Sequence, residues 1–128
     1  MAVTIPVSWG ELFDKLTILE IKQTRIKDRQ KLVNITRELE ALREISSTAG
    51  RPEKALQALV VELRRLNESL WIIEDDIRKC ERDQDFSEPF IDLARSVYKT
   101  NDKRAEVKRQ INRLLDSELI EEKSYESY

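Results

Sequence analysis

One apolar seam in the middle of the chain limits most strongly what this sequence can fold into. Its members recur at alternating spacings of three and four residues, at Leu56, Leu59, Leu63, Leu66, Leu70, Ile73, Ile77 and Cys80. In an α-helix this spacing places every member on one face, whereas a half-buried β-strand alternates at every second residue. The seam therefore predicts a long helix that buries one face against other helices.

Residues that favour turns are scarce, and this limits the number of chain reversals. Only 2 glycines and 3 prolines occur among the 128 residues. Such a composition disfavours β-sandwiches, β-barrels and repeated hairpins. Two short segments, 46–52 and 83–87, have the composition of connections. They divide the chain into predicted helices at about 9–46, 52–82 and 88–115, followed by a tail at 116–128.

The predicted helices begin at recognisable residues. Ser8 and Glu11 form a capping box, in which side chains satisfy free amides of the first turn. Pro52 and Pro89 suit the first turns of the two later helices. Because short connections force neighbouring helices to run antiparallel, the sequence predicts an all-α, elongated, coiled-coil-like up-down-up three-helix bundle. We expect it to form a single helical domain over residues 1–128.

The charge of the chain is dense but balanced. Lysine and arginine number 23 against 25 aspartates and glutamates, a net charge of -2. There is no basic excess to neutralise phosphates, so we expect no nucleic-acid partner. No stretch approaches the ~18 uncharged apolar residues of a membrane span, and the first residues lack the basic and apolar regions of a signal peptide. We expect a cytoplasmic protein without a membrane partner.

Several kinds of catalytic chemistry are excluded or weakened by the composition. Histidine is absent, which removes histidine-based triads and the commonest metal ligand. The single cysteine, Cys80, excludes an intramolecular disulfide and a zinc site built on several cysteines. The consecutive carboxylates of 74–76 point to different sides of a helix and form a poor magnesium site. We assign no catalytic residue, metal or cofactor, and favour a non-enzymatic protein while leaving the question open.

The centre of the last predicted helix departs from the apolar pattern. At heptad-like spacing its seam reads Phe90, Ala94, Val97, Asn101, Arg104, Lys108, Ile111 and Leu115. Counting residues from the shared end of an antiparallel bundle brings Arg25, Asp28 and Asn67 to the level of these polar residues. We therefore expect a polar layer across the middle of the bundle.

Two interpretations of this layer remain open. It is either a buried hydrogen-bonded network that fixes helix register, or a cationic pocket for an anionic ligand, since arginine binds carboxylates and phosphates with a forked geometry. In the second case Trp71 or Tyr98 forms an apolar wall. The candidate ligand-binding residues are Lys22, Arg25, Asn67, Trp71, Arg95, Tyr98, Asn101, Arg104 and Lys108.

Four segments carry a resemblance to a known family. They read SWGELFDKLTILEIKQTRI (8–26), LNESLWIIEDDIRKCE (66–81), FIDLARSVYKTNDKRAEVKRQIN (90–112) and EEKSY (121–125). Together they resemble a family of small bacterial helical proteins without an assigned function. The resemblance covers nearly the whole chain and implies a bacterial, cytosolic, all-helical protein. It implies no catalytic residue.

A looser resemblance concerns the first helix alone. The segment ELFDKLTILEIKQTRI, with Asp14, Glu20 and Arg25, looks like the first helix of the all-helical chorismate mutases. The rest of the chain lacks the further arginine, lysine, acid and glutamine at that family's spacing. An enzyme of this kind works by electrostatic stabilisation and positioning and needs no cofactor.

The function that we expect first is a non-enzymatic module that binds another protein or a second copy of itself. A thin bundle has a large lateral surface, and a small core often gains from oligomerisation. A three-helix monomer is expected to leave a second apolar face partly uncovered, made of Ile18, Ile21, Leu32 and Ile35. An exposed apolar strip of this kind marks an interaction site.

The alternative function is binding of an anionic small molecule, or a cofactor-independent, chorismate-mutase-like reaction at the central layer. This alternative predicts a concave pocket in which Arg25, Arg104 or Lys108 has no carboxylate partner within the chain.

Overall fold

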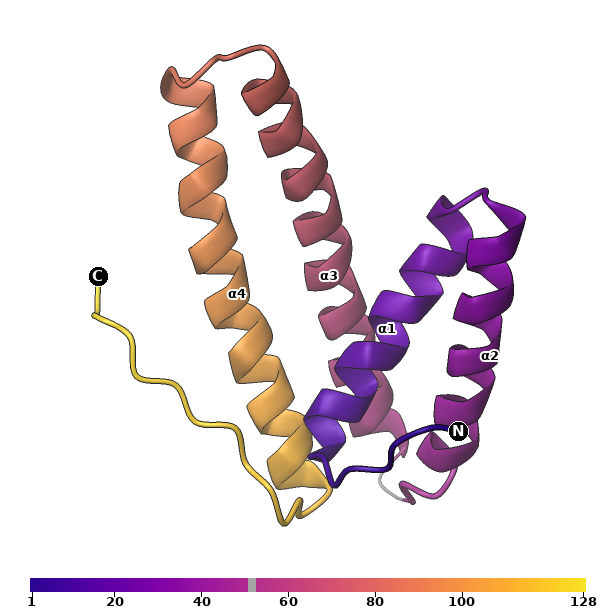
Figure 1. The fold of residues 1–128 in the computed structure, drawn as a ribbon. Coiled ribbons are helices and arrows are strands. Elements are labelled where there is room, and N and C mark those ends of the chain that lie inside the picture. Colours follow the sequence, from indigo (N-terminus) through magenta and orange to yellow (C-terminus); the bar gives the residue numbers. More distant parts are fainter. Residues whose placement is uncertain (51–52) are drawn as a thin grey trace.

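The computed structural model describes residues 1–50 and 53–128, and these residues form four helices in two hairpins (Figure 1). The helices are α1 (Trp9–Arg25), α2 (Arg29–Ser46), α3 (Glu53–Arg82) and α4 (Glu88–Leu114). No strand occurs in these ranges, so the all-helical prediction is confirmed. The predicted three-helix, up-down-up bundle is wrong, because four helices are present. The expected position of Pro52 in a first helical turn lies outside the described residues.

The error lies in the first predicted helix, which is two helices. The chain leaves α1 at Ile26, whose backbone is extended (φ -86°, ψ 133°). Asp28 then caps α2, its side chain accepting a hydrogen bond from the Lys31 amide at 3.0 Å. Neither proline nor glycine marks this break, and the apolar spacing continues across it. An aspartate at an N-cap was the one local signal of a new helix.

Folding α2 back on α1 changes which apolar residues are exposed. Ile21 is 1% exposed and Ile35 is 8% exposed, while Ile18 and Leu32 are half-buried. The second apolar face expected on the first helix is therefore absent as an exposed strip, because α1 and α2 cover each other. A continuous helix over residues 9–46 would have left that face open to water, which is unfavourable in proportion to its area.

Helix α1 joins the two hairpins. It contacts α2, α3 and α4, whereas α2 makes contacts with α1 alone among the described helices. Figure 1 shows the α1–α2 hairpin and the α3–α4 hairpin diverging in a V from the end where α1 begins. The core lies at this closed end and includes Leu12, Leu16, Leu19, Leu39, Leu63, Leu66, Val107 and Ile111.

Beyond the core, α3 and α4 continue as a pair that no third helix covers. No residue from 68 to 106 is buried. We call residues 70–97 the arm; it contains the distal halves of both helices and the connection between them. The seam residues Leu70, Ile73 and Ile77, which a complete bundle would bury, are only half-buried in the arm. None of the described helices is long and apolar enough to cross a membrane.

The role of Asp28 in starting α2 can be tested by substitution. Asp28→Ala removes the side-chain acceptor at the N-cap and should lower the free energy of unfolding by about 1 kcal/mol, a decrease of roughly 4 °C in melting temperature. Asp28→Ser keeps an acceptor and should stay close to the wild type. Thermal unfolding followed by circular dichroism distinguishes the two, and equal losses for both variants would contradict the capping role.

Candidate functional site

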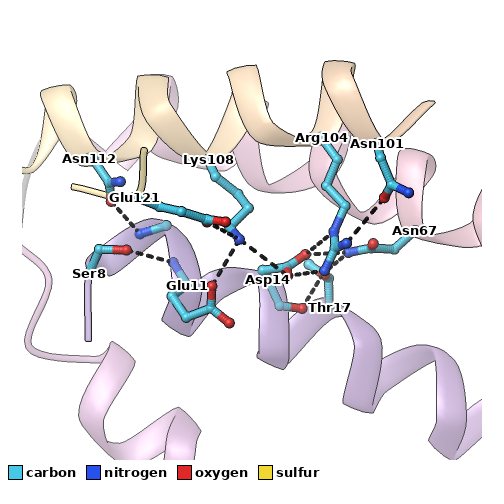
Figure 2. Close-up of polar contacts among 11 residues, drawn as sticks. Ser8, Glu11, Asp14, Thr17, Asn67, Asn101, Arg104, Lys108, Asn112 and Glu121 are labelled. Atoms are coloured by element: carbon cyan, nitrogen blue, oxygen red, sulfur yellow. Dashed lines mark hydrogen bonds and ion pairs between the residues drawn. The ribbon is translucent and has the colours of Figure 1, made fainter. Parts of the chain in front are cut away.

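The polar cluster of the protein is built around the carboxylate of Asp14 in α1. This side chain is 1% exposed although it is charged. Arg104 reaches it from α4 with a forked pair of hydrogen bonds: Nε donates to Oδ1 at 2.9 Å and Nη2 donates to Oδ2. Such forked, charge-assisted pairs are among the strongest side-chain interactions. Figure 2 shows Arg104 and Lys108 directed from α4 towards this part of α1.

Helix α3 completes the cluster through Asn67. Its Nδ2 donates to Asp14 Oδ1 at 2.9 Å and to Thr17 Oγ1 at 2.9 Å. The Thr17 hydroxyl in turn donates to the Asp14 carbonyl oxygen at 2.9 Å. Three helices therefore meet at one carboxylate: α1 carries it, and α3 and α4 each donate hydrogen bonds to it.

Lys108 forms a second group of ion pairs one turn along α4. Its ammonium lies 2.8 Å from Glu11 Oε2, 2.8 Å from Glu121 Oε2 and 3.9 Å from Asp14 Oδ2. Burial alone would lower the pKa of Lys108, but the hydrogen bonds to Glu11 and Glu121 outweigh it, so the pKa is raised. Because Glu121 belongs to the C-terminal tail, this contact also holds the tail against α4.

The close approach of α1 to α4 depends on Gly10. Its backbone amide donates to Asn112 Oδ1 at 2.7 Å. A Cβ atom at this position would lie 2.5 Å from the carbonyl oxygen of Lys108, a distance that real Cβ atoms do not show. The absence of a side chain at Gly10 thus lets α1 come near enough for Glu11 and Asp14 to reach the cations of α4.

Every charged group of this cluster has a partner of opposite charge within the cluster. Two cations, Arg104 and Lys108, contact three carboxylates, Asp14, Glu11 and Glu121. The pKa of Arg104 is raised because its guanidinium donates to Asp14, although burial opposes this shift. No buried side-chain nitrogen or oxygen in the described part of the chain lacks a hydrogen-bond partner. This arrangement corresponds to the hydrogen-bonded network, the first of the two interpretations of the polar layer.

The space beside this cluster is small. A cavity of about 10 Å³ is bordered in part by Lys108, Asn112 and Glu121, and this volume is close to what a single water molecule needs. Residues 1–50 and 54–128 include no group of three or more carboxylate and cysteine side chains that could hold a metal ion.

The structure brings together four of the nine predicted site residues, Asn67, Asn101, Arg104 and Lys108. Asn101 joins through its Oδ1, which accepts from Arg104 Nη1 at 3.3 Å. A second pair, Arg25 and Trp71, lies at the far end of α1: the Arg25 guanidinium is 6.0 Å from the Trp71 ring centre.

The remaining predicted site residues lie apart from the cluster. Arg25 pairs with Glu68 of α3 at 2.6 Å, so this cation has a partner within the chain. Lys22 is half-buried on α1 and Arg95 is exposed on α4. Tyr98 packs edge-on against Tyr128 of the tail, with ring centres 5.4 Å apart. The nine residues therefore do not converge on one pocket.

The predicted set omitted the acidic half of the cluster. Gly10, Asp14, Thr17 and Ile21 follow each other at spacings of four, three and four residues, and all of them are buried. A charged residue on an otherwise apolar helix face is the signal that points to Asp14, since a buried charge needs a partner. No comparable signal exists for Glu121, which lies in a segment without periodicity.

The network interpretation predicts a large effect of removing the central cation. Arg104→Met leaves the Asp14 carboxylate buried without its guanidinium, and should lower the free energy of unfolding by about 3–5 kcal/mol. Arg95→Met removes an exposed arginine of the same helix and should change it by less than about 0.5 kcal/mol. Urea unfolding measures both. Equal stability of the two variants, together with stabilisation of the wild type by a dicarboxylate, would support the pocket interpretation instead.

The contact between the tail and Lys108 predicts a pH dependence. The hydrogen bond from Lys108 holds the pKa of Glu121 below its ordinary value of 4.5. A lowered carboxyl pKa stabilises the folded state above the unfolded value, and this contribution is lost as the pH falls through the folded pKa. Glu121→Gln should therefore melt below the wild type at neutral pH, and the difference should disappear as the pH falls below the ordinary value of 4.5 and through the lowered pKa of Glu121. A difference that persists at low pH would contradict the ion pair.

Comparison with known proteins gives a family but no activity. No curated protein and no solved structure matches the chain. A family of unknown function, DUF6165, matches residues 1–128, the whole length of the sequence. This match supports one part of the resemblance carried by the four segments: the chain belongs to a family without an assigned function. This chain belongs to the DUF6165 family of unknown function.

Proposed function

We propose that this protein is a non-enzymatic helical module that binds another protein chain through the arm. The observation that carries the proposal is the uncovered seam of α3 and α4. A three- or four-helix arrangement buries such a seam, as the base of the same two helices shows at Leu63, Leu66 and Ile111. In the arm, residues in the same periodic positions stay half-buried because two helices alone cannot enclose them.

Other large apolar side chains of the arm are exposed and add to the surface that it offers. Ile72 on α3 is 49% exposed and Ile91 on α4 is 51% exposed, and Phe86 in the connection is 48% exposed. Exposed apolar residues that occur singly are ordinary, whereas several on a helix pair whose seam is also uncovered are typical of a protein interaction site. The proposal therefore places the partner on the distal halves of α3 and α4.

The alternative of an anionic ligand receives less support from the geometry. It requires cations without internal partners, yet Arg25 pairs with Glu68, and both Arg104 and Lys108 pair with carboxylates of α1. A further anion at this cluster would add negative charge where carboxylates already outnumber cations. Binding there would require Glu121 to leave Lys108.

The proposal can be tested with a photo-crosslinking amino acid placed in the arm. Substituted for the exposed Ile91, the crosslinker should form a covalent adduct with a protein chain when cells producing the variant are irradiated. The same amino acid in place of Gln110, which is exposed at the base of α4, is the matched control and should form none. Mass spectrometry of the adduct identifies the bound chain.

The result that would overturn the proposal is equally direct. If the Ile91 variant melts like the wild type and gives no more adduct than the Gln110 variant, the arm does not bind protein. Melting curves of both variants are needed beside the crosslinking, so that loss of folding is not mistaken for loss of binding.

A further inference from the structure

We infer that α2 carries a second docking surface, which binds an acidic amphipathic helix of another protein. The surface is a shallow hollow of about 540 Å³ along α2. It belongs to the α1–α2 hairpin and shares no residue with the arm. The residues that border it are Arg29, Leu32, Val33, Thr36, Arg37 and Glu40.

Helix α2 has a large surface that no other helix covers. Among the described helices it contacts α1 alone, and Figure 1 shows it at the outer edge of the V. Its buried residues are Ile35 and Leu39, which belong to the core. Neither residue borders the hollow, so the hollow lies beside the face that α2 packs into the core.

The floor of the hollow is apolar. Val33 is 50% exposed, and Leu32 and Thr36 beside it are half-buried. Positions on a helix surface that make no internal packing contacts are best filled by strong helix formers such as alanine, glutamate and lysine. The β-branched side chains of Val33 and Thr36 lose rotamer freedom in a helix. Helix formation therefore does not account for these two residues, whereas contact with an apolar partner does.

Two arginines at the edge of this floor have no acidic partner. Among the residues that the structure describes, neither Arg29 nor Arg37 forms an ion pair, whereas Arg43 of the same helix pairs with Glu20 of α1. Arg29 and Arg37 are eight residues apart, roughly 12 Å along the helix axis. Two carboxylates at a matching spacing on a partner would pair with both guanidinium groups.

The chain next to the hollow has an excess of positive charge. Residues 22–31, at the end of the α1–α2 hairpin, contain five lysines and arginines against one acidic residue, Asp28. One of the five, Arg25, pairs with Glu68, which leaves four cations. A local excess of one sign attracts a segment of the opposite sign during encounter. The charge around the hollow therefore selects an acidic partner.

The shape of the hollow selects the kind of partner. A small-molecule site encloses most of the surface of its ligand, but every residue that borders this hollow belongs to α2. A second helix needs only a groove between rows of side chains on the first. Attachment to a lipid surface needs apolar side chains that project outward, and Val33 is the one apolar lining residue that is exposed. A protein helix is the occupant that fits.

The size of the hollow predicts the strength of the complex. Residues 29–40 rise roughly 16 Å along the helix axis, about three turns. A single helix laid along this length buries less than the ~1,200 Å² of a standard interface. We therefore expect reversible binding, with a dissociation constant between the micromolar and millimolar range.

The probe for this surface is a short fluorescent peptide that is stapled into a helix. It carries a leucine stripe at helical spacing and two glutamates eight residues apart, the separation of Arg29 and Arg37. On the isotope-labelled full chain it should shift the amide resonances of residues 29–40, and fluorescence anisotropy gives the dissociation constant. The same peptide with glutamines in place of the glutamates should bind at least about tenfold more weakly.

Two charge reversals on α2 form a matched pair. Arg37→Glu places like charges together and should raise the dissociation constant at least about tenfold. Lys31→Glu makes the same change of charge at an exposed position of α2 that does not border the hollow, and should raise it less than about threefold because solvent screens the charge. Both variants should melt like the wild type, since neither residue forms an ion pair in the described part of the chain.

A charge exchange tests the contact directly. Two further peptides each have one of the two glutamates replaced by lysine. One of them should restore binding to Arg37→Glu, because its lysine lies opposite the new carboxylate, and the other should not. The peptide that restores binding also gives the direction of the partner helix along α2.

Three results would overturn the inference. The first is resonance shifts that lie outside residues 29–40. The second is an equal loss of binding in Arg37→Glu and Lys31→Glu, which would mean attraction by net charge alone. The third is binding of the chain to vesicles with an anionic phospholipid that Arg37→Glu abolishes, without binding of the peptide. None of these measurements involves the arm, so this surface and the proposed function are tested separately.

Discussion

The forked contact between Asp14 and Arg104 is the interaction on which the rest of the structure depends. A carboxylate that is 1% exposed is unfavourable unless it is paired and hydrogen-bonded. Arg104 supplies the charge from α4 and Asn67 supplies a neutral donor from α3. Both partners have defined geometries, so the carboxylate determines the relative position of three helices as well as their contact. An apolar core of the same size would tolerate sliding of one helix along another; this cluster does not.

Gly10 and Lys108 show how local and distant contacts support each other at this point. The missing side chain of Gly10 brings α1 against the backbone of α4. That approach puts Glu11 within 2.8 Å of Lys108, and Lys108 then holds Glu121 of the tail. The packing of α1 against α4 thus positions the Lys108 ammonium, which in turn binds the tail through Glu121. The closed end of the V therefore concentrates the buried polar groups together with most of the core.

The arm has the opposite character. It carries the continuation of the same seam, but no third helix of the described residues covers it, and acidic residues precede basic ones along both α3 and α4. A protein that needed only to be stable would gain by shortening these helices to the length that α1 covers. Their extension beyond α1 leaves half-buried apolar residues in water, which is unfavourable for an isolated chain. Association through the arm is the physical reason that we propose for retaining it.

The sequence by itself determined the helical class, through the three- and four-residue spacing of Leu56 to Cys80, and the turn after Arg82. It also placed Asn67 level with Asn101 and Arg104, with Lys108 one turn further along the last helix, because counting along antiparallel helices is reliable when the turn between them is short. Only the tertiary structure decided that the chain reverses at 26–28, where no proline or glycine stands and a single N-cap competes with a continuous apolar pattern. It also decided that Asp14, Glu11 and Glu121 close the cluster. The reversal at 26–28 and the closure of the cluster both depend on contacts between residues far apart in the chain. The free energy of such contacts outweighs local helix preference, and the contacts produce no periodic pattern in the sequence.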